Sequence, residues 1–333
     1  MPLLKCSSPM FSFTLILSTI SVLSASHWFF MWMMMELNLF SFIPLIFSSS
    51  SINESESAIK YFLAQAMGSS ILFIFIILNN SQTSFTSLLP ILLITSMLIK
   101  LGAAPCHFWF PSVMNSMSWI SCFILSSWQK ISPLFILSFF FSSFNNYTLI
   151  ILGILNSLVG GIYGINQSSL RTMLAYSSIS HLGWMLVVMN FSMSTLLMYF
   201  ITYIMMILPI MMISHSLSVS YKPQLFSSSN LPRSMMLLIS LLFLSMSGLP
   251  PFLGFFPKWI VLQSMVASNL FLYSLLLIMS SLLTSFFYLN FMLTLSMKSF
   301  QSMTHLSPSI SSISSVSSIS FLMIMIMPSL LAI

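Results

Sequence analysis

Long apolar runs, each followed by a short break of polar, serine, proline or asparagine residues, recur along the whole chain. Most runs are about 20 residues long, the length an α-helix needs to cross a hydrocarbon core of about 30 Å. A membrane β-barrel would instead alternate apolar and polar residues over roughly ten-residue segments. The breaks predict eleven spans, over residues 10–25, 27–47, 58–79, 88–110, 119–142, 147–166, 170–190, 194–217, 234–265, 269–295 and 314–333. We therefore predict an all-α polytopic membrane protein in which residues 1–333 form one membrane domain.

The composition supports this class and excludes several others. Of the 333 residues, 58% are hydrophobic and 4% are charged, against about 25% charged in soluble domains. The net charge of +6 comes from scattered Lys and Arg, without a basic cluster for nucleic acid. Cys6, Cys106 and Cys122 form no C-x-x-C pair and no cluster with histidine, so we expect no metal site. Because nucleotide-binding and haem-ligand motifs are also missing, we expect no cofactor in this chain.

The charges in the loops and at the ends of the apolar runs predict the orientation in the membrane. With eleven crossings, six basic residues fall on the side of the N-terminus and none on the other side: Lys5, Lys60, Arg171, Lys222, Arg233 and Lys298. Basic residues of short loops stay on the side from which a protein is inserted. We therefore expect the N-terminus on the cytoplasmic or matrix side and the C-terminus on the opposite side. Glu54 and Glu56 share the N-terminal side as solvated loop residues.

Two of the predicted spans are interrupted next to a lysine. In 88–110, Lys100 precedes a break from Gly102 to Pro105, and in 234–265, Lys258 follows a segment with three prolines. Within a bilayer, such breaks are tolerated only where protein or a water-filled cavity surrounds them. Paired broken helices in two halves of a chain also mark transport sites near the membrane midplane. The match is imperfect, because one lysine precedes its break and the other follows.

The two broken spans are five spans apart, which predicts an internal repeat. Because five is odd, repeats of that length lie upside down relative to each other. We expect one five-helix repeat at 10–142, a second and inverted one at 147–295, and a closing helix at 314–333.

Four charged side chains lie well inside predicted spans, whereas Lys60 and Arg171 lie at span ends. The four are Glu36, Lys100, Lys130 and Lys258. A charge at the centre of a bilayer costs about 2.5–3.5 kcal/mol on insertion scales, so such residues mark function more often than structure. Burial disfavours the charged form of an amine and a nearby carboxylate favours it, so Glu36 and Lys100 are a candidate control pair for proton transfer. Lys130 and Lys258 would continue the path. The alternative interpretation is an inert buried ion pair that holds helices together.

Two histidines inside predicted spans, His107 and His181, are secondary relay candidates, because imidazole titrates near neutral pH. A purely structural role is the alternative for both.

Several segments together resemble a known family, the mitochondrially encoded chain 2 of NADH–ubiquinone oxidoreductase. The similarity follows nearly the whole chain in order. The segments that carry it are Glu36–Leu39, Ser41–Pro44, Lys60–Leu63, Lys100–Pro105, His107–Pro111, Trp128–Lys130, Ser177–Trp184, Gly248–Phe255 and Pro257–Trp259. The segment up to about Phe30 and the region from Lys298 match weakly.

The resemblance implies an antiporter-like, proton-pumping subunit of respiratory complex I in the mitochondrial inner membrane. It looks like the shortened animal form, and its length and methionine usage look like an arthropod's. In the family, the residues matching Glu36, Lys100, Lys130 and Lys258 form a charged axis, with the histidines matching His107 and His181 along it. The implied partners are other membrane-arm subunits and inner-membrane lipids, including cardiolipin, and no nucleic acid.

The resemblance also implies that NADH, FMN, iron–sulfur clusters and ubiquinone belong to the whole complex, with no redox site in this chain. Two alternatives remain open. One is a stand-alone cation/proton antiporter, since that family shares the fold. The other is a scaffold subunit that does not pump.

Overall fold

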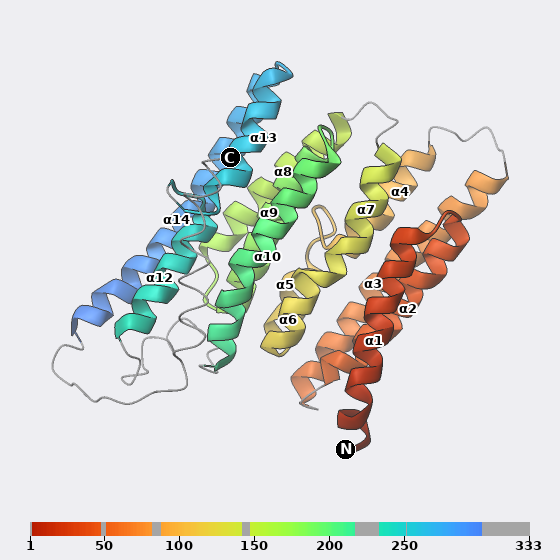
Figure 1. Cartoon of the computed structure of the whole chain (residues 1–333), viewed down its shortest axis with the longest axis horizontal. Helices are drawn as coiled ribbons and strands as arrows, with labels where there is room; N and C mark the ends of the chain where they lie inside the picture. Colours follow the sequence, from red (N-terminus) through yellow and green to blue (C-terminus); the bar gives the residue numbers. More distant parts are fainter. Residues whose placement is uncertain are drawn as a thin grey trace. The chain divides into compact units, whose positions relative to one another are not determined.

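The computed structural model describes residues 2–47, 51–81, 88–141, 147–216, 233–250 and 252–301. Within these residues, every regular element is a helix (Figure 1). Six stretches of the described chain are long and apolar enough to cross a membrane, by length and composition: Trp28–Ile46, Ile52–Asn80, Trp119–Phe140, Tyr147–Ile165, Met193–Ser216 and Phe271–Leu293. The prediction of an all-α polytopic membrane protein is confirmed.

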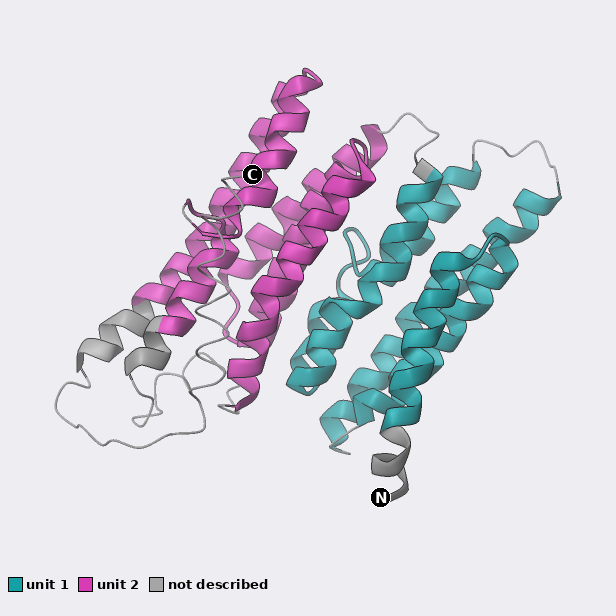
Figure 2. Ribbon diagram, viewed as in Figure 1, with its two compact units in different colours: residues 1–145 teal, residues 146–333 magenta. Residues whose placement is uncertain are grey.

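Residues 1–145 form one compact unit (Figure 2). Within it, α3 packs against α2, α4 and α5, and α7 packs against α1 and α4. The elements are α1 (Pro2–Ser24), α2 (Trp28–Ile46), α3 (Ile52–Asn80), α4 (Leu88–Leu101), α5 (Trp109–Ser116), α6 (Trp119–Ser126), the short 3-10 helix η2 (Trp128–Lys130) and α7 (Ile131–Phe141).

Residues 146–333 form the second compact unit (Figure 2). Its centre is α9, which is buried along nearly its whole length and contacts α8, α10, α13 and α14. The described elements are α8 (Tyr147–Ile165), α9 (Leu170–Val188), α10 (Met193–Ser216), α12 (Arg233–Ser247), α13 (Phe255–Ala267) and α14 (Phe271–Gln301).

Small residues allow α8 and α9 to approach each other closely. A Cβ atom on Gly183 would lie 2.4 Å from the carbonyl oxygen of Gly153, and one on Gly160 would lie 2.6 Å from the carbonyl oxygen of Tyr176. In lipid, helices associate through such close backbone packing, because the surrounding acyl chains are as apolar as the side chains. The glycines therefore set the separation of the two helices.

Helices occupy each predicted range from 10–25 to 269–295, and the range 314–333 lies outside the described residues. The boundary between the two compact units falls between the predicted repeats 10–142 and 147–295. The total of eleven spans and the inverted relation of the repeats stay predictions.

One expectation about the loops is wrong. Glu54 is 3% exposed and lies in the first turn of α3, whereas we predicted a solvated loop residue. The hydroxyl of Ser51 accepts the backbone N–H of Glu54 at 3.3 Å and so starts the helix six residues before the predicted boundary at residue 58. Serine is a favoured cap, and an acidic residue is stabilised near a helix N-terminus. Glu56 is exposed and pairs with Lys60, one turn later in the helix.

The predicted span 88–110 is divided into α4 and α5. Gly102 follows the end of α4 with φ +68°, a conformation that glycine adopts without strain. The backbone N–H groups of Gly102 and Ala103 donate back to the carbonyls of Ile99 and Leu98 at 3.1 and 2.9 Å. These two bonds are the Schellman pattern that ends helices. A Cβ on Gly102 would also lie 2.8 Å from Cβ of Phe110, so the return of the chain needs a glycine here.

The predicted span 234–265 is divided in the same manner into α12 and α13. Gly248 follows α12 with φ +78°, and its N–H donates to the carbonyl of Ser245 at 3.2 Å. Both predicted breaks therefore begin with a left-handed glycine directly after a helix.

A third interruption was not predicted. The range 119–142 contains α6, η2 and α7 in succession, with Lys130 as the last residue of η2. Pro133 explains the change, because it has no N–H to donate to the carbonyl of Gln129 four residues earlier, and its ring crowds that carbonyl. The α-helical hydrogen bonding is therefore not continuous beside Lys130.

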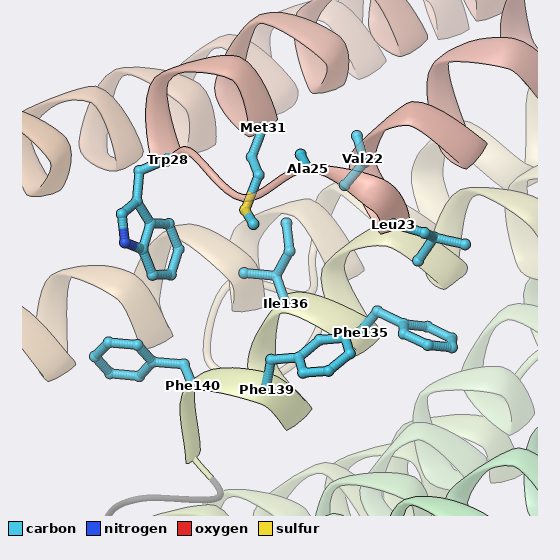
Figure 3. A pocket seen from close by; sticks show the side chains of 9 residues that line it. All are labelled: Val22, Leu23, Ala25, Trp28, Met31, Phe135, Ile136, Phe139 and Phe140. Atoms are coloured by element: carbon cyan, nitrogen blue, oxygen red, sulfur yellow. The ribbon is translucent and has the colours of Figure 1, made fainter.

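An apolar pocket of about 460 Å³ lies in the first unit, between the junction of α1 and α2 and one face of α7 (Figure 3). Its lining residues are Val22, Leu23, Ala25, Trp28, Met31, Phe135, Ile136, Phe139 and Phe140. None of them is titratable, so this pocket is separate from the buried charges.

Candidate functional site

Lys100 lies in the last turn of α4 and is 8% exposed. Its aliphatic stem passes Gly68 of α3, where a Cβ atom would lie 3.0 Å from Cγ of the lysine. Its amino group donates to Sδ of Met35 at 3.8 Å. A thioether is a weak acceptor, so this contact does not strongly favour the charged form of the amino group.

The backbone carbonyls at the broken end of α4 are bonded by side chains as well as by the backbone. The indole N–H of Trp109 donates to the carbonyl of Ile99 at 3.0 Å. The amide of Gln65 donates to the carbonyl of Lys100 at 3.1 Å. Helix ends leave carbonyls without intrahelical partners, and in lipid such groups must be satisfied by the protein. Gln65 and Trp109 therefore make the break beside Lys100 tolerable.

Glu36 lies in the middle of α2 and is half-buried. It is near enough for its charge to act on Lys100 and on Tyr61. Glu36 and Lys100, both described residues, form no ion pair with each other, and Oε1 of Glu36 is a buried atom with no hydrogen-bond partner within the described part of the chain. A buried carboxylate oxygen without a donor is unfavourable. The charge of Glu36 thus acts on Lys100 without an ion pair that would hold the two groups together.

Lys130 is 2% exposed and lies where η2 meets α7. Its amino group lies 5.3 Å from the centre of the Phe110 ring, which comes from α5. An ammonium over an aromatic ring gains about 0.5–2 kcal/mol, more when water is excluded. Phe110 is also the residue that Gly102 accommodates, so the break after α4 shapes the surroundings of both Lys100 and Lys130.

His107 lies in the break between α4 and α5 and is buried. Its Nδ1 lies 3.3 Å from the carbonyl oxygen of Pro105, and its ring lies 4.2 Å from that of Phe108, centre to centre. Because a carbonyl only accepts, Nδ1 is the protonated nitrogen when this bond forms.

Lys258 lies in the first turn of α13 and is 7% exposed. Its amino group donates to the carbonyl of Ser247 at 2.8 Å and lies 5.9 Å from the Trp184 ring centre. Ser247 is the last residue of α12, and the C-terminal end of a helix carries partial negative charge that favours a cation by about 0.3–1 kcal/mol. A Cβ on Gly248 would lie 2.7 Å from this amino group, so glycine also makes room for it.

The position of Lys258 accounts for the imperfect match between the two broken spans. Lys100 belongs to the last turn of α4, and Lys258 reaches back across its break to the last carbonyl of α12. Each lysine is therefore associated with the C-terminal end of the first half of a broken helix.

His181 is buried on α9, and its Nδ1 lies 3.0 Å from the hydroxyl oxygen of Tyr199 on α10. The ring of Tyr203 lies 5.3 Å away, centre to centre. Trp184, one turn further along α9, contacts Lys258. Of the candidate residues in the second unit, His181 therefore lies on α9 and Lys258 lies beside it.

Sequence reasoning did not find the uncharged partners of these groups. Met35, Gln65, Ser247 and Tyr199 provide these contacts. The one available signal was the presence of Gln65 inside an apolar run, since a buried amide needs a partner.

Comparisons with known proteins agree with this architecture. The family model described as NADH:quinone oxidoreductase/Mrp antiporter, TM, matches residues 25–284. NADH-ubiquinone oxidoreductase chain 2 of Lumbricus terrestris is 40% identical over 289 residues, covering 84% of each chain. The protein of the same name from Anopheles gambiae is 40% identical over 303 residues, covering 89% of this chain and 88% of the relative.

Two solved structures have the same fold. A chain of respiratory complex I from Thermus thermophilus with bound aureothin has a TM-score of 0.82 at 20% identity, covering 97% of this chain and 77% of that chain. A chain of the Mrp complex from Dietzia sp. DQ12-45-1b has a TM-score of 0.73 at 14% identity, covering 90% and 61%.

By its fold and its buried lysines at helix breaks, this is an antiporter-like membrane protein. It belongs to the NADH:quinone oxidoreductase/Mrp antiporter family and, within it, to the NADH-ubiquinone oxidoreductase chain 2 proteins.

Proposed function

We propose that this chain is a proton-translocating core subunit of NADH:ubiquinone oxidoreductase, complex I, in which protons move along a buried axis. The axis consists of Glu36, Lys100, Lys130 and Lys258, with His107 and His181 as secondary relays. The observation that carries the proposal is that all three lysines are buried and lie at interruptions of helices. A charge and a broken helix are each unfavourable in lipid, so their threefold coincidence supports a working site.

The buried groups need an external source of energy. Moving one proton against 100 mV requires about 2.3 kcal/mol. In this proposal the energy comes from redox chemistry in other subunits, which hold NADH, FMN, iron–sulfur clusters and ubiquinone. This chain contributes the groups that bind and release protons: a change in the distance from Glu36 to Lys100 alters the protonation of the lysine, and the proton passes on through Lys130 and Lys258.

The same proposal places the chain in the mitochondrial inner membrane. The relatives are animal chain 2 proteins, and the basic residues of the sequence favour an N-terminus in the matrix and a C-terminus in the intermembrane space. Its partners are other membrane-arm subunits and inner-membrane lipids, among them cardiolipin. The division of the chain at residues 145 and 146, and the left-handed glycine at each of two breaks, support two inverted five-helix repeats.

Replacement of Lys100 or Lys258 by Met tests the proposal, because Met keeps the length of the side chain but carries no proton. In the assembled complex, in sealed membranes, we expect less proton translocation for each NADH oxidised. If the chain is only a scaffold, the variants will fail to assemble, or will assemble and translocate protons normally. Unchanged electron transfer and proton yield in both variants would contradict the proposal.

The structural similarity to a chain of an Mrp complex favours a second candidate, a stand-alone cation/proton antiporter. Such a protein would exchange protons for sodium or potassium ions without other subunits. The purified chain in liposomes with an imposed sodium or potassium gradient separates the two candidates: proton movement there supports the antiporter, and its absence supports dependence on the complex.

A further inference from the structure

A hydrogen bond between two side-chain amides joins α2 to η2. Nε2 of Gln129 donates to Oδ1 of Asn38 at 3.0 Å, and Asn38 is buried. In apolar surroundings an amide that loses its partner is unfavourable. The bond therefore holds these two elements in one relative position.

Each of the two amides is close in sequence to a charged residue of the proposed axis. Asn38 follows Glu36 by two residues on α2, and Met35 of the same segment contacts the amino group of Lys100. Gln129 directly precedes Lys130. This hydrogen bond thus connects the segment that carries Glu36 to the segment that carries Lys130.

The local backbone leaves the position of Lys130 open to tertiary contacts such as this hydrogen bond. The backbone N–H of Ser127 still donates to the carbonyl of Phe123 at 3.0 Å, where α6 ends. Beyond it, η2 has the weaker hydrogen bonding of a 3-10 turn, and Pro133 provides no N–H to the carbonyl of Gln129. An element that is not held by a continuous helical ladder needs a tertiary contact to fix its position.

We propose that the hydrogen bond between Asn38 and Gln129 positions Lys130 relative to Glu36, so that a displacement of α2 during turnover also displaces Lys130. The inference rests on the proposed function. Asn38 and Gln129 are positioning residues, since they act through Glu36 and Lys130 and carry no proton themselves.

The variant Gln129→Asn tests this role with little change in polarity, because it keeps the amide and shortens the side chain by one methylene, out of reach of Asn38. In the assembled complex, in sealed membranes, we expect NADH oxidation to continue while proton translocation for each NADH falls to the level of Lys130→Met. The double exchange Asn38→Gln with Gln129→Asn restores the combined reach, and we expect it to restore the wild-type proton yield.

A matched control is Gln167→Asn, which makes the same chemical change at a glutamine that follows α8. The side-chain amide of Gln167 donates to the carbonyl of Tyr163, near the end of α8, at 3.0 Å. We expect the wild-type proton yield from it. A general effect of shortening glutamine would lower the yield in both single variants.

The outcomes separate this inference from the function on which it rests. A wild-type yield in Gln129→Asn beside a lowered yield in Lys130→Met overturns the positioning role and leaves the function standing. Wild-type yields in both variants overturn both proposals. Loss in Gln129→Asn without restoration by the double exchange also overturns the positioning role. The same holds if the shortened variant fails to assemble and the double exchange restores assembly, since the bond would then serve assembly alone.

Discussion

The amino group of Lys100 donates to the thioether of Met35 at 3.8 Å, and Met35 directly precedes Glu36 in α2. The amino group of Lys258, by contrast, donates to the backbone carbonyl of Ser247 at 2.8 Å. A carbonyl is a much stronger acceptor than a thioether. The hydrogen bond of Lys258 thus favours a charged amine more than the contact of Lys100 with a thioether does.

The first prediction concerns Met35. Replacing Met35 by Gln places a strong acceptor beside Lys100, and a hydrogen bond to a charged group contributes about 1.5–3 kcal/mol. We expect the new acceptor to stabilise the charged form of Lys100 and the rate of proton translocation to fall roughly tenfold or more. Met35→Leu, of similar volume and without an acceptor, should behave nearly as wild type. The rate of proton translocation during NADH oxidation, measured in sealed membranes, checks both variants, and equal rates in the two would contradict the role of the weak acceptor.

The second prediction concerns Gly248, where a side chain would strain the backbone and displace Lys258. For Gly248→Ala, we expect a loss of about 1–2 kcal/mol from the left-handed conformation, and a lowered proton yield because the new Cβ would lie 2.7 Å from the lysine amino group. Asn tolerates φ near +78° better than Ala does. Gly248→Asn should therefore regain thermal stability of the complex but not proton yield, and recovery of both would argue against displacement of the lysine.

Trp109 is the subject of the third prediction. Trp109→Phe keeps a ring against Tyr61, whose centre lies 6.0 Å away, but removes the donor to the carbonyl of Ile99. That carbonyl also accepts a backbone N–H, so we expect destabilisation of about 1 kcal/mol. Trp109→Leu removes the ring as well and should destabilise more. Thermal unfolding of the assembled complex measures both, and an equal effect of the two variants would assign the role to the indole N–H alone.

The fourth prediction separates the relay role of His181 from its packing. Tyr199→Phe removes the hydroxyl that lies 3.0 Å from Nδ1 of His181 and leaves the ring in place. If this pair passes protons, the variant should lower the proton yield with a loss of stability of only about 1 kcal/mol. A wild-type yield at the same loss of stability would indicate that His181 is a structural residue held by its tyrosine.

Much of the fold was predictable because the signals are local. The length of an apolar run decides whether a helix can cross the bilayer, and glycine and proline decide where it is broken. Glu36, Lys100, Lys130 and Lys258 stood out for the same reason, since a charge inside an apolar run needs no partner to be noticed. The start of α3 was placed too late because the cap at Ser51 precedes the apolar run.

The partners of the charged residues were not predictable in this manner. Met35 lies 65 residues from Lys100, and Asn38 lies 91 residues from Gln129. Which of many apolar or amide side chains meets a given lysine depends on the rotation and separation of packed helices. Those in turn depend on close contacts such as that of Gly68 with Lys100.

The amino-acid sequence by itself determined the class of the protein, the positions of the helices in the described chain, and two of the three interruptions, because each follows from the chemistry of adjacent residues. Only the tertiary structure decided that Lys100 contacts a thioether while Lys258 contacts a helix end, and that an amide pair joins the segments of Glu36 and Lys130. The physical reason is that hydrogen-bond strength and electrostatic influence depend on distances across helices, which the order of residues along the chain does not contain.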